Sequence, residues 1–242
     1  MKILAVDSSG LVASVAVVED DVLLAEYTTN YKKTHSQTLL PMLNEIKEMI
    51  DLDLNSIDYI AVAAGPGSFT GLRIASATVK GMGLALKKDI VEVPTLEGLA
   101  FNLCGTDKFV CPLMDARRNQ VYTGIYHFVE KDHEWVMETI CEQCAVDVRE
   151  IIQTCNELGQ EVIFLGDGVP GFKTQVEEKV TVPYSFAPAS CNRQRAAAIG
   201  TLAFSYAEEG KMEKAEEHMP DYLRLSQAER ERKEEMERGA AN

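Results

Sequence analysis

The chain has 242 residues, 46% of them hydrophobic and 26% charged, which is ordinary for a soluble globular protein of one large or two modest domains. Its formal net charge is −14, with 38 acidic residues against 24 basic ones, and this balance argues against a direct, high-affinity grip on nucleic-acid phosphates. No segment reaches membrane-spanning length, and the first apolar run is too short for a signal peptide, so we expect a cytoplasmic protein with no membrane contact.

Three β-rich runs with short connections open the chain and predict an antiparallel meander. They are Lys2–Asp7, Ala13–Val18 and Val22–Thr28. A helix then runs to Met49, with Thr34 or Ser36 as its N-cap. Strands at Asp58–Gly65 and Ile90–Val93 flank a second helix, and this order of elements is typical of a ribonuclease-H-like half-domain.

The helix that ends at Met49 carries more apolar side chains than one core requires. Its expected core stripe consists of Leu39, Leu43, Ile46 and Ile50. Leu40, Met42 and Met49 widen the apolar arc to about 180°, against roughly 100° for a helix that covers a single core. We therefore expect part of this helix to contact something besides its own core.

A helix predicted over Leu72–Leu86 follows a buried strand and the glycine-rich turn at residues 65–71. A phosphate loop would need Gly-Lys-Ser/Thr at the start of this helix, and the dinucleotide fingerprint would need a third glycine at Thr70. Neither is present. We therefore interpret the turn as structural rather than nucleotide-binding, with Ser68 and Thr70 as capping residues.

The composition of this second helix sets it apart. Arg73 and Lys80 share one narrow stripe, whereas apolar and small side chains spread around nearly all the rest. The small residues would let another helix approach closely, although each internal glycine costs roughly 1 kcal/mol relative to alanine. The helix is either a central core helix of this one domain or is half buried by another protein chain.

A second unit starts near Lys108, and its elements echo those of the first. We expect strands at Phe109–Asp115, Gln120–Val129, Trp135–Cys141 and Glu161–Gly166, and helices at Asp147–Leu158 and Cys191–Ala207. We therefore assign residues 1–105 to an N-terminal ribonuclease-H-like lobe and residues 106–225 to a C-terminal one. Residues 226–242 mix charges without an apolar stripe, which is typical of a solvated helical tail.

Two aspartates, Asp7 and Asp115, stand where two-lobed ATP-binding folds keep a carboxylate beside a phosphate loop. The turn after Asp7 has one glycine and the turn after Asp115 has none, so neither offers the consecutive unhindered N–H groups of an anion nest. These turns disfavour an autonomous kinase or ATPase. Arg117 and Arg118 could meet an anion, although a surface turn is their commoner meaning.

Other catalytic patterns are equally incomplete. No two histidines have the i, i+4 spacing of a helical metal site. Cys141 and Cys144 have zinc-like spacing without a second pair, so we interpret them, like the other four cysteines, as reduced and structural. Glycines do not flank Ser68 as a nucleophile elbow requires. We expect no catalytic residue, no bound cofactor and no metal.

The string Gly65-Pro-Gly-Ser-Phe-Thr-Gly-Leu-Arg73 resembles a motif of the TsaB (YeaZ) family. Further similar pieces cover almost the whole chain in order: Leu4–Ser8, His35-Ser36, Pro94–Gly98, Asp115–Arg117, Gln120–Tyr122 and Pro220–Arg224. The resemblance implies an α/β, two-lobed actin/Hsp70-like (ASKHA) fold of two ribonuclease-H-like domains.

The resemblance also implies a function. It points to a non-catalytic scaffold subunit that supports the catalytic subunit TsaD, with the ATPase TsaE, in placing threonylcarbamoyl on the adenosine next to the anticodon of tRNA. It implies a homodimer through the same N-terminal surface that binds TsaD, and contact with tRNA only through the complex. The related catalytic subunit carries a His-x-Glu-x-His metal site, whereas the similar place here is Thr95-Leu-Glu-Gly-Leu99, which lacks both imidazoles.

We predict that the first two helices together form the surface that binds the partner, mainly by apolar burial. Its candidate residues are Leu39, Met42, Leu43, Ile46, Arg73, Ile74, Ala77, Lys80 and Gly81. Two alternatives stay open. An ATP-dependent phosphotransferase or ATPase of the same fold would bind ATP as an isolated chain, and a metallopeptidase-like hydrolase would hold stoichiometric zinc or iron.

Overall fold

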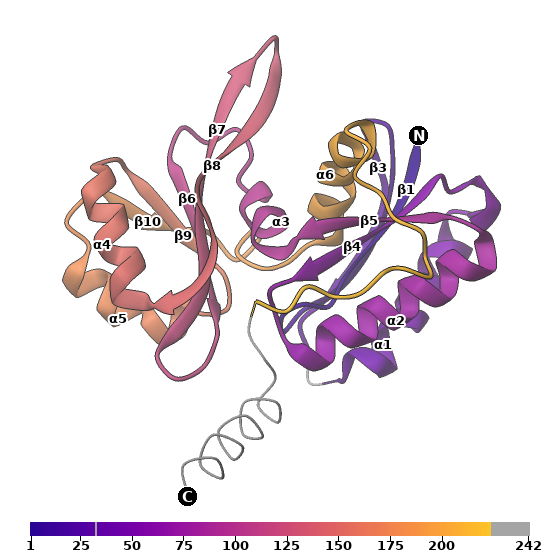
Figure 1. The fold of residues 1–242 in the computed structure, drawn as a ribbon, viewed down its shortest axis with the longest axis horizontal. Helices are drawn as coiled ribbons and strands as arrows, with labels where there is room; N and C mark the ends of the chain where they lie inside the picture. The colour runs from indigo at the N-terminus through magenta and orange to yellow at the C-terminus, as the bar shows by residue number, and fades with distance from the viewer. Residues whose placement is uncertain (32, 224–242) are drawn as a thin grey trace, which may run out of the picture.

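Two lobes, each built on a five-stranded mixed sheet, make up the molecule (Figure 1). The computed structural model describes residues 1–31 and 33–223, so the tail expected at 226–242 lies outside the described residues. Within the described part of the chain, no helix is both long and apolar enough to cross a lipid bilayer.

The first sheet has the strand order β3-β2-β1-β4-β5. Its strands are β1 (Lys2–Asp7), β2 (Ala13–Glu19), β3 (Val22–Thr29), β4 (Tyr59–Gly65) and β5 (Asp89–Pro94). Strands β1 to β3 form the predicted antiparallel meander, while β4 pairs parallel to β1 and β5 parallel to β4. Because parallel neighbours need a crossover, helices stand before and after β4.

Helices cover both faces of this sheet (Figure 1). Helices α1 (His35–Met49) and α2 (Phe69–Leu86) pack on one face, and α6 (Ala196–Glu208) packs on the other. Strand β1 contributes Leu4 to the first core and Ile3 to the second, as expected for side chains that alternate between faces. The short 3-10 turn η1 (Leu54–Ser56) leads from α1 towards β4.

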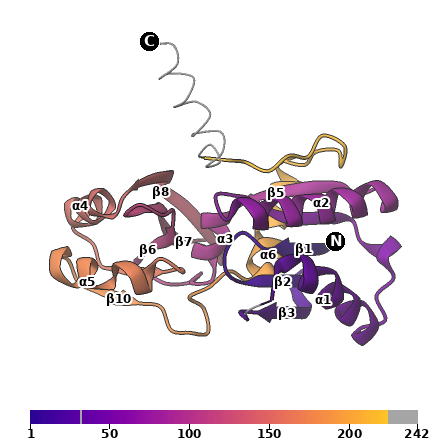
Figure 2. The same ribbon diagram turned by 90° about the horizontal axis from the view of Figure 1, so that it is seen from below.

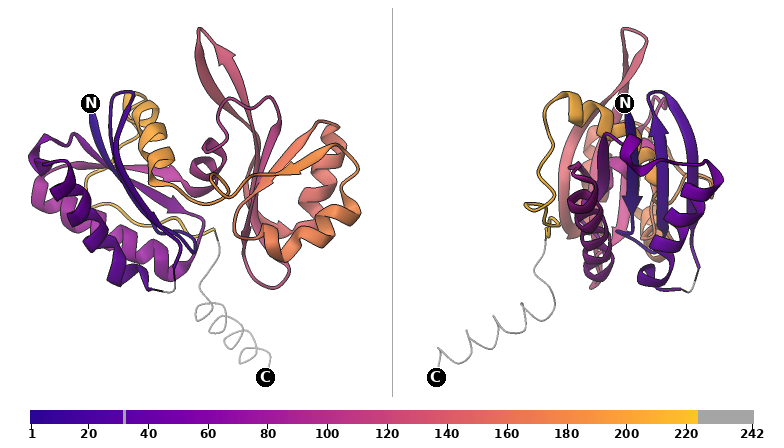
Figure 3. Two further views of the ribbon diagram at one scale, coloured as in Figure 1. Left: turned by 180° about the vertical axis from the view of Figure 1, so that it is seen from behind. Right: turned by 90° about the vertical axis from the view of Figure 1, so that its right-hand side faces the viewer.

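The second sheet has the strand order β10-β9-β6-β7-β8. Its strands are β6 (Phe109–Asp115), β7 (Gln120–Lys131), β8 (Glu134–Asp147), β9 (Val162–Leu165) and β10 (Tyr184–Phe186). Helices α4 (Val148–Leu158) and α5 (Val169–Lys179) pack on one face. The short helix α3 (Thr95–Phe101) packs on the other. The β7–β8 hairpin projects beyond both lobes (Figure 3).

The two sheets have the same topology. In each, the first strand pairs antiparallel with the second, the second antiparallel with the third, and the fourth joins parallel to the first and to the fifth. The predicted echo between the halves is therefore confirmed, and with it the two-lobed actin/Hsp70-like architecture of two ribonuclease-H-like domains.

The end of the chain corrects the expected extent of the second lobe. The sequence analysis places α6 in the C-terminal lobe of residues 106–225. Its apolar side chains instead pack on the first sheet, against residues such as Ala5 and Val91. The segment that follows, residues 211–223, also lies on the first lobe, where Glu213 pairs with Ile90 of β5 through two backbone hydrogen bonds of 2.9 Å. We call residues 211–223 the C-terminal strap. Figure 2 shows it alongside α2, on the side away from α1.

Short elements account for most of the misses of the sequence analysis. Helix α3 has seven residues and β10 three, too few for hydrophobic periodicity to stand out. The sequence analysis did not predict helix α5 either, since only Phe172 and Val176 are buried in it and they form no broad apolar stripe. Helix α6 starts at Ala196 rather than at Cys191.

Candidate functional site

The glycine-rich turn before α2 is built for close packing against the turn after β1. A Cβ atom at Gly67 or at Gly71 would overlap the carbonyl oxygen of Ser9 or Ser8, respectively. The backbone N–H of Ser68 donates to the Ser9 carbonyl at 2.6 Å, and the Ser8 hydroxyl donates to the Gly71 carbonyl at 2.9 Å. The glycines therefore let two backbone segments touch, as a structural turn requires.

Only one of the two predicted capping residues caps α2. The Ser68 side chain accepts a hydrogen bond from the Gly71 N–H at 3.3 Å, so the helix begins at Phe69 rather than at Leu72. Thr70 lies inside the helix, which corrects its assignment as a cap. At the start of α1, Thr34 occupies the N-cap position without a side-chain capping hydrogen bond.

The structure divides the predicted interface residues between core and surface. Leu39, Met42 and Ile46 of α1 are 2%, 4% and 4% exposed and belong to the core between α1, α2 and the sheet. The expectation that these three contact a partner is therefore corrected, because the sheet of their own lobe already covers them. Leu43 is half-buried at the edge of that core.

The apolar residues that α1 and α2 leave uncovered are different ones. On α1, Leu40 is 55% and Met49 74% exposed, and on α2 Leu84 is 52% exposed. Ala77 and Gly81 of α2 are also exposed, and a Cβ atom at Gly81 would meet no heavy atom within 4 Å. Ile74 is half-buried. The predicted apolar surplus exists, and it points to solvent through this second set of residues.

The basic stripe of α2 is held by the C-terminal strap. The Lys80 ammonium donates to the carbonyl oxygens of Glu216 at 2.7 Å and His218 at 3.2 Å. The Arg73 guanidinium lies 4.0 Å from the centre of the Phe69 ring and donates through Nε to the Tyr222 hydroxyl at 3.2 Å. The strap therefore engages both charged residues of the predicted interface within the chain itself.

A cleft with a volume of about 700 Å³ opens between the lobes, beside the glycine-rich turn before α2. Ser9 lines the cleft, and the buried Asp7 at the end of β1 accepts hydrogen bonds through Oδ1 from the Ser9 N–H at 2.8 Å and the Ser9 hydroxyl at 2.6 Å. Burial raises the pKa of the Asp7 carboxyl, and the Ser9 hydrogen bonds oppose that rise. His35 lines the cleft and donates through Nε2 to the Gly10 carbonyl at 2.9 Å.

On the opposite wall of the cleft, the charged residues of the turn after β6 pair with each other. Asp115 is exposed and accepts from the Arg117 N–H at 2.7 Å and from its guanidinium at 3.1 Å. Arg117, Arg118 and Asn119 all have positive φ angles, of 63°, 55° and 60°. Asp167 accepts from the Asp115 N–H at 3.2 Å, and burial raises the pKa of its carboxyl. The turn is therefore closed by an internal ion pair at Arg117.

Glu97, which corresponds to the glutamate of the His-x-Glu-x-His metal motif, is hydrogen-bonded within the chain. Glu97 of α3 accepts a hydrogen bond from the Tyr206 hydroxyl of α6, and burial raises the pKa of the Glu97 carboxyl. Thr95 and Leu99, which stand where the motif has histidines, are 0% and 1% exposed. Neither side chain supplies an imidazole, so this position offers a metal only one carboxylate.

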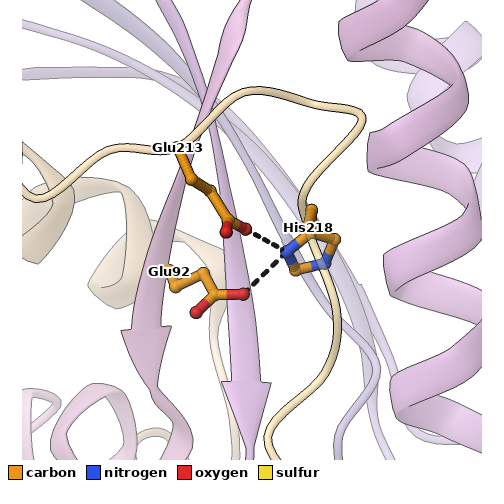
Figure 4. A group of neighbouring side chains, drawn as sticks. All are labelled: Glu92, Glu213 and His218. Atoms are coloured by element: carbon orange, nitrogen blue, oxygen red, sulfur yellow. Dashed lines mark hydrogen bonds and ion pairs between the residues drawn. The ribbon is translucent and has the colours of Figure 1, made fainter.

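A cluster that the sequence analysis missed joins β5 to the strap. Glu92, Glu213 and His218 form, among the described residues, the one group of three or more potential metal-ligating side chains whose donor atoms all lie within 4.8 Å of one another (Figure 4). Cys141 and Cys144 are not part of such a group. No spacing rule could have found the cluster, because Glu92 and Glu213 meet only through the return of the strap.

A family model described as "TsaD: tRNA N6-adenosine threonylcarbamoyltransferase" matches residues 22–232. The tRNA threonylcarbamoyladenosine biosynthesis protein TsaB of Bacillus subtilis (strain 168) is 33% identical over 231 residues, which cover 95% of this chain and 96% of that protein. The chain belongs to the TsaB family. TsaB of Escherichia coli (strain K12) is 28% identical to it, over 69% of this chain and 72% of that protein.

Solved structures agree with the TsaB assignment. YeaZ from Pseudomonas aeruginosa superposes with a TM-score of 0.75 at 25% identity, covering 91% of this chain and 99% of that one. A second structure from the same organism, described as an uncharacterized protein with similarity to peptidase YEAZ, has the same TM-score at 26% identity and covers 92% and 99%. In this TsaB-family chain, the motif at residues 65–73 that carried the resemblance joins α2 to the β1 turn.

Proposed function

We propose that this chain is a non-catalytic scaffold subunit in the biosynthesis of threonylcarbamoyladenosine in tRNA. In this role it binds a TsaD-like catalytic subunit, together with a TsaE-like ATPase, and supports transfer of threonylcarbamoyl to the adenosine next to the anticodon. The names of its TsaB relatives support the pathway, and the apolar surface of α1 and α2 supports the scaffold role. The net charge of −14 favours contact with tRNA through the complex rather than through this chain alone.

The observation that carries the proposal is the exposed apolar set on α1 and α2. Its exposed members are Leu40, Met49, Ala77, Gly81 and Leu84, and the half-buried Leu43 and Ile74 complete it. Small residues at positions 77 and 81 let a partner helix approach α2 closely, and the larger side chains around them supply the apolar area. A stable interface of about 800 Å² per partner is the usual requirement, and two parallel-running helix faces are suited to it.

The same patch supports self-association. Two copies related by a twofold axis would place identical apolar faces against each other, so a homodimer and a complex with the catalytic subunit would compete for one surface. We expect added TsaD-like subunit to reduce the homodimer fraction of this chain in sedimentation or light-scattering measurements. A homodimer that persists unchanged inside the mixed complex would show that the two contacts use different surfaces.

A matched pair of glycine variants tests the interface. Gly81 of α2 and Gly171 of α5 occupy corresponding helices of the two lobes, and a Cβ atom at either would meet nothing within 4 Å. We expect Gly81→Glu to abolish copurification with the TsaD-like subunit and Gly171→Glu to leave it intact. Both variants should keep the wild-type circular dichroism spectrum. Undiminished binding by Gly81→Glu would refute the assignment of this surface.

Reconstitution tests the scaffold role itself. The purified chain is mixed with TsaD-like and TsaE-like subunits, ATP, threonylcarbamoyl-adenylate and unmodified tRNA, and the modified nucleoside is measured. We expect modification to depend on this chain, to fail with Gly81→Glu and to survive with Gly171→Glu. Full modification without the chain would overturn the proposal.

A further inference from the structure

The cluster of Glu92, Glu213 and His218 has no part in the function proposed above. Glu92 belongs to β5, whereas Glu213 and His218 both belong to the C-terminal strap (Figure 4). The His218 Nδ1 atom lies 2.7 Å from Glu213 Oε1 and 2.7 Å from Glu92 Oε1. The imidazole is 1% exposed, so water has almost no access to it. Two carboxylates thus converge on a single buried ring nitrogen.

One oxygen of these carboxylates lacks a hydrogen-bond partner among the described residues. A ring nitrogen carries at most one hydrogen, and the hydrogen bond of Nδ1 goes to Glu213. Within residues 1–31 and 33–223, Glu92 Oε1 is buried and accepts no hydrogen bond, although it lies 2.7 Å from the same nitrogen. Leaving such an acceptor unsatisfied away from water is unfavourable, and more so when the group is charged. The cluster therefore contains an orphaned oxygen that is directed at its centre.

The charges are unbalanced as well. Among the described residues, no lysine or arginine forms an ion pair with Glu92 or Glu213. The nearby Lys80 ammonium donates to backbone carbonyls of the strap, and the Lys214 ammonium pairs with Asp89. Even a charged imidazole would leave one of two carboxylates uncompensated. A divalent cation beside a neutral imidazole would balance both.

We propose that Glu92, Glu213 and His218 bind a divalent transition-metal ion of the zinc type, which fastens the C-terminal strap to β5. One imidazole nitrogen and two carboxylate oxygens are ligands that zinc accepts. Zinc–ligand bonds of about 2.0–2.2 Å place the ligand atoms of a tetrahedral site about 3.4 Å apart. That separation lies between the 2.7 Å contacts of Nδ1 and the 4.8 Å within which all three donors fall, so small rotations of the glutamate side chains suffice.

The ion would complete an attachment that the backbone has begun. Glu213 is held to Ile90 by two backbone hydrogen bonds, which fixes one ligand relative to β5. Beyond His218, the strap continues to the cleft, where the Asp221 N–H donates to the Ala64 carbonyl at 2.9 Å and Tyr222 stacks on Phe69 at a ring separation of 4.6 Å. The metal thereby anchors the segment that holds the basic stripe of α2.

The test is a titration of the metal-free full-length chain with Zn²⁺ by calorimetry, and with Co²⁺ as a spectroscopic probe. We expect one ion per chain, a visible Co²⁺ absorption band typical of four- or five-coordination, and a higher melting temperature, because a ligand that binds only the folded state stabilises it. Amide hydrogen exchange in residues 211–223 should slow when the metal is present. The TsaD-like subunit is not needed for any of these measurements.

Variants assign the ion to this cluster. His218→Asn and Glu92→Gln should each weaken binding at least tenfold, and Glu92→Gln keeps the shape of its side chain if His218→Asn fails to fold. The matched control is His133→Asn, since that imidazole is 99% exposed and lies 4.0 Å from Glu130. Cys141→Ser should also bind normally. Absence of saturable binding by the wild-type chain, or undiminished binding by Glu92→Gln, would overturn the proposal, and loss of the ion in Cys141→Ser would transfer it to the thiols.

Discussion

The helical pairs of the two lobes differ in what they leave exposed. Helices α1 and α2 carry the exposed side chains of Leu40, Met49 and Leu84, whereas α4 and α5, which are described in full, carry no large exposed hydrophobic residue. Both pairs pack on the same face of the same topology. The fold therefore does not require an apolar outer surface on these helices, which makes the surplus of the first lobe a feature of that lobe alone.

The two turns that face each other across the cleft, after β1 and after β6, differ in their exposure to solvent. The turn after β1 is buried, and the glycine-rich turn before α2 packs against its carbonyl oxygens. The turn after β6 is exposed, and Arg117 pairs with Asp115 inside it. The first lobe thus uses the turn after its first strand to position α2, while the turn after β6 stays in solvent and the second lobe packs Gly166 and Gly168 against the Leu113 carbonyl instead.

The largest difference in the free energy of unfolding should be between variants at positions 42 and 40 of α1. Met42→Glu would bury a carboxylate in the core, so we expect loss of more than about 4 kcal/mol and unfolding of the first lobe. Leu40→Glu should change the free energy of unfolding by less than about 0.5 kcal/mol because that side chain is exposed, yet it should weaken binding of the TsaD-like subunit. Urea denaturation and copurification measure the two effects. Equal stability of both variants would contradict the division of α1 into core and surface.

A smaller effect should come from the close approach of α2 to the β1 turn. Gly71→Ala forces a Cβ atom against the Ser8 carbonyl, and we expect it to destabilise the fold by about 1–3 kcal/mol. Gly81→Ala is the control, because its Cβ atom enters open space and should stabilise the helix by up to about 1 kcal/mol. Thermal denaturation of both variants checks the prediction. A neutral Gly71→Ala would mean that the turn relaxes freely.

The smallest effect concerns the aspartates of the two turns. Burial raises the pKa of Asp7 in the folded chain above its unfolded value, so stability should fall as pH rises through the interval between them. Asp7→Asn removes this dependence, and we expect the variant to gain stability relative to wild type at neutral pH but not at acidic pH. Asp115→Asn loses only an exposed ion pair and should cost less than about 1 kcal/mol. Urea denaturation at both pH values distinguishes the variants, and parallel profiles for Asp7→Asn and wild type would contradict the burial argument.

Periodicity and turn chemistry predicted most of the framework from the sequence. The meander β1 to β3, the strands β4 to β7 and β9, and the helices α1, α2 and α4 lie within a few residues of their predicted positions. Each has a run long enough for alternation or helical spacing to stand out, as in β1 or α1. The motif at residues 65–73 likewise indicated the TsaB family, because that string depends on local sequence alone.

The sequence by itself determined which helices were apolar, but not which way their residues point. An arc of about 180° on α1 admits several orientations, and only the packing of the sheet put Met42 inside and Leu40 outside. Only the tertiary structure shows that α6 and the strap pack on the first lobe and that Glu92 lies beside His218. These contacts join residues far apart in the chain. No local sequence pattern predicts them, because the residues meet only when the whole chain has folded.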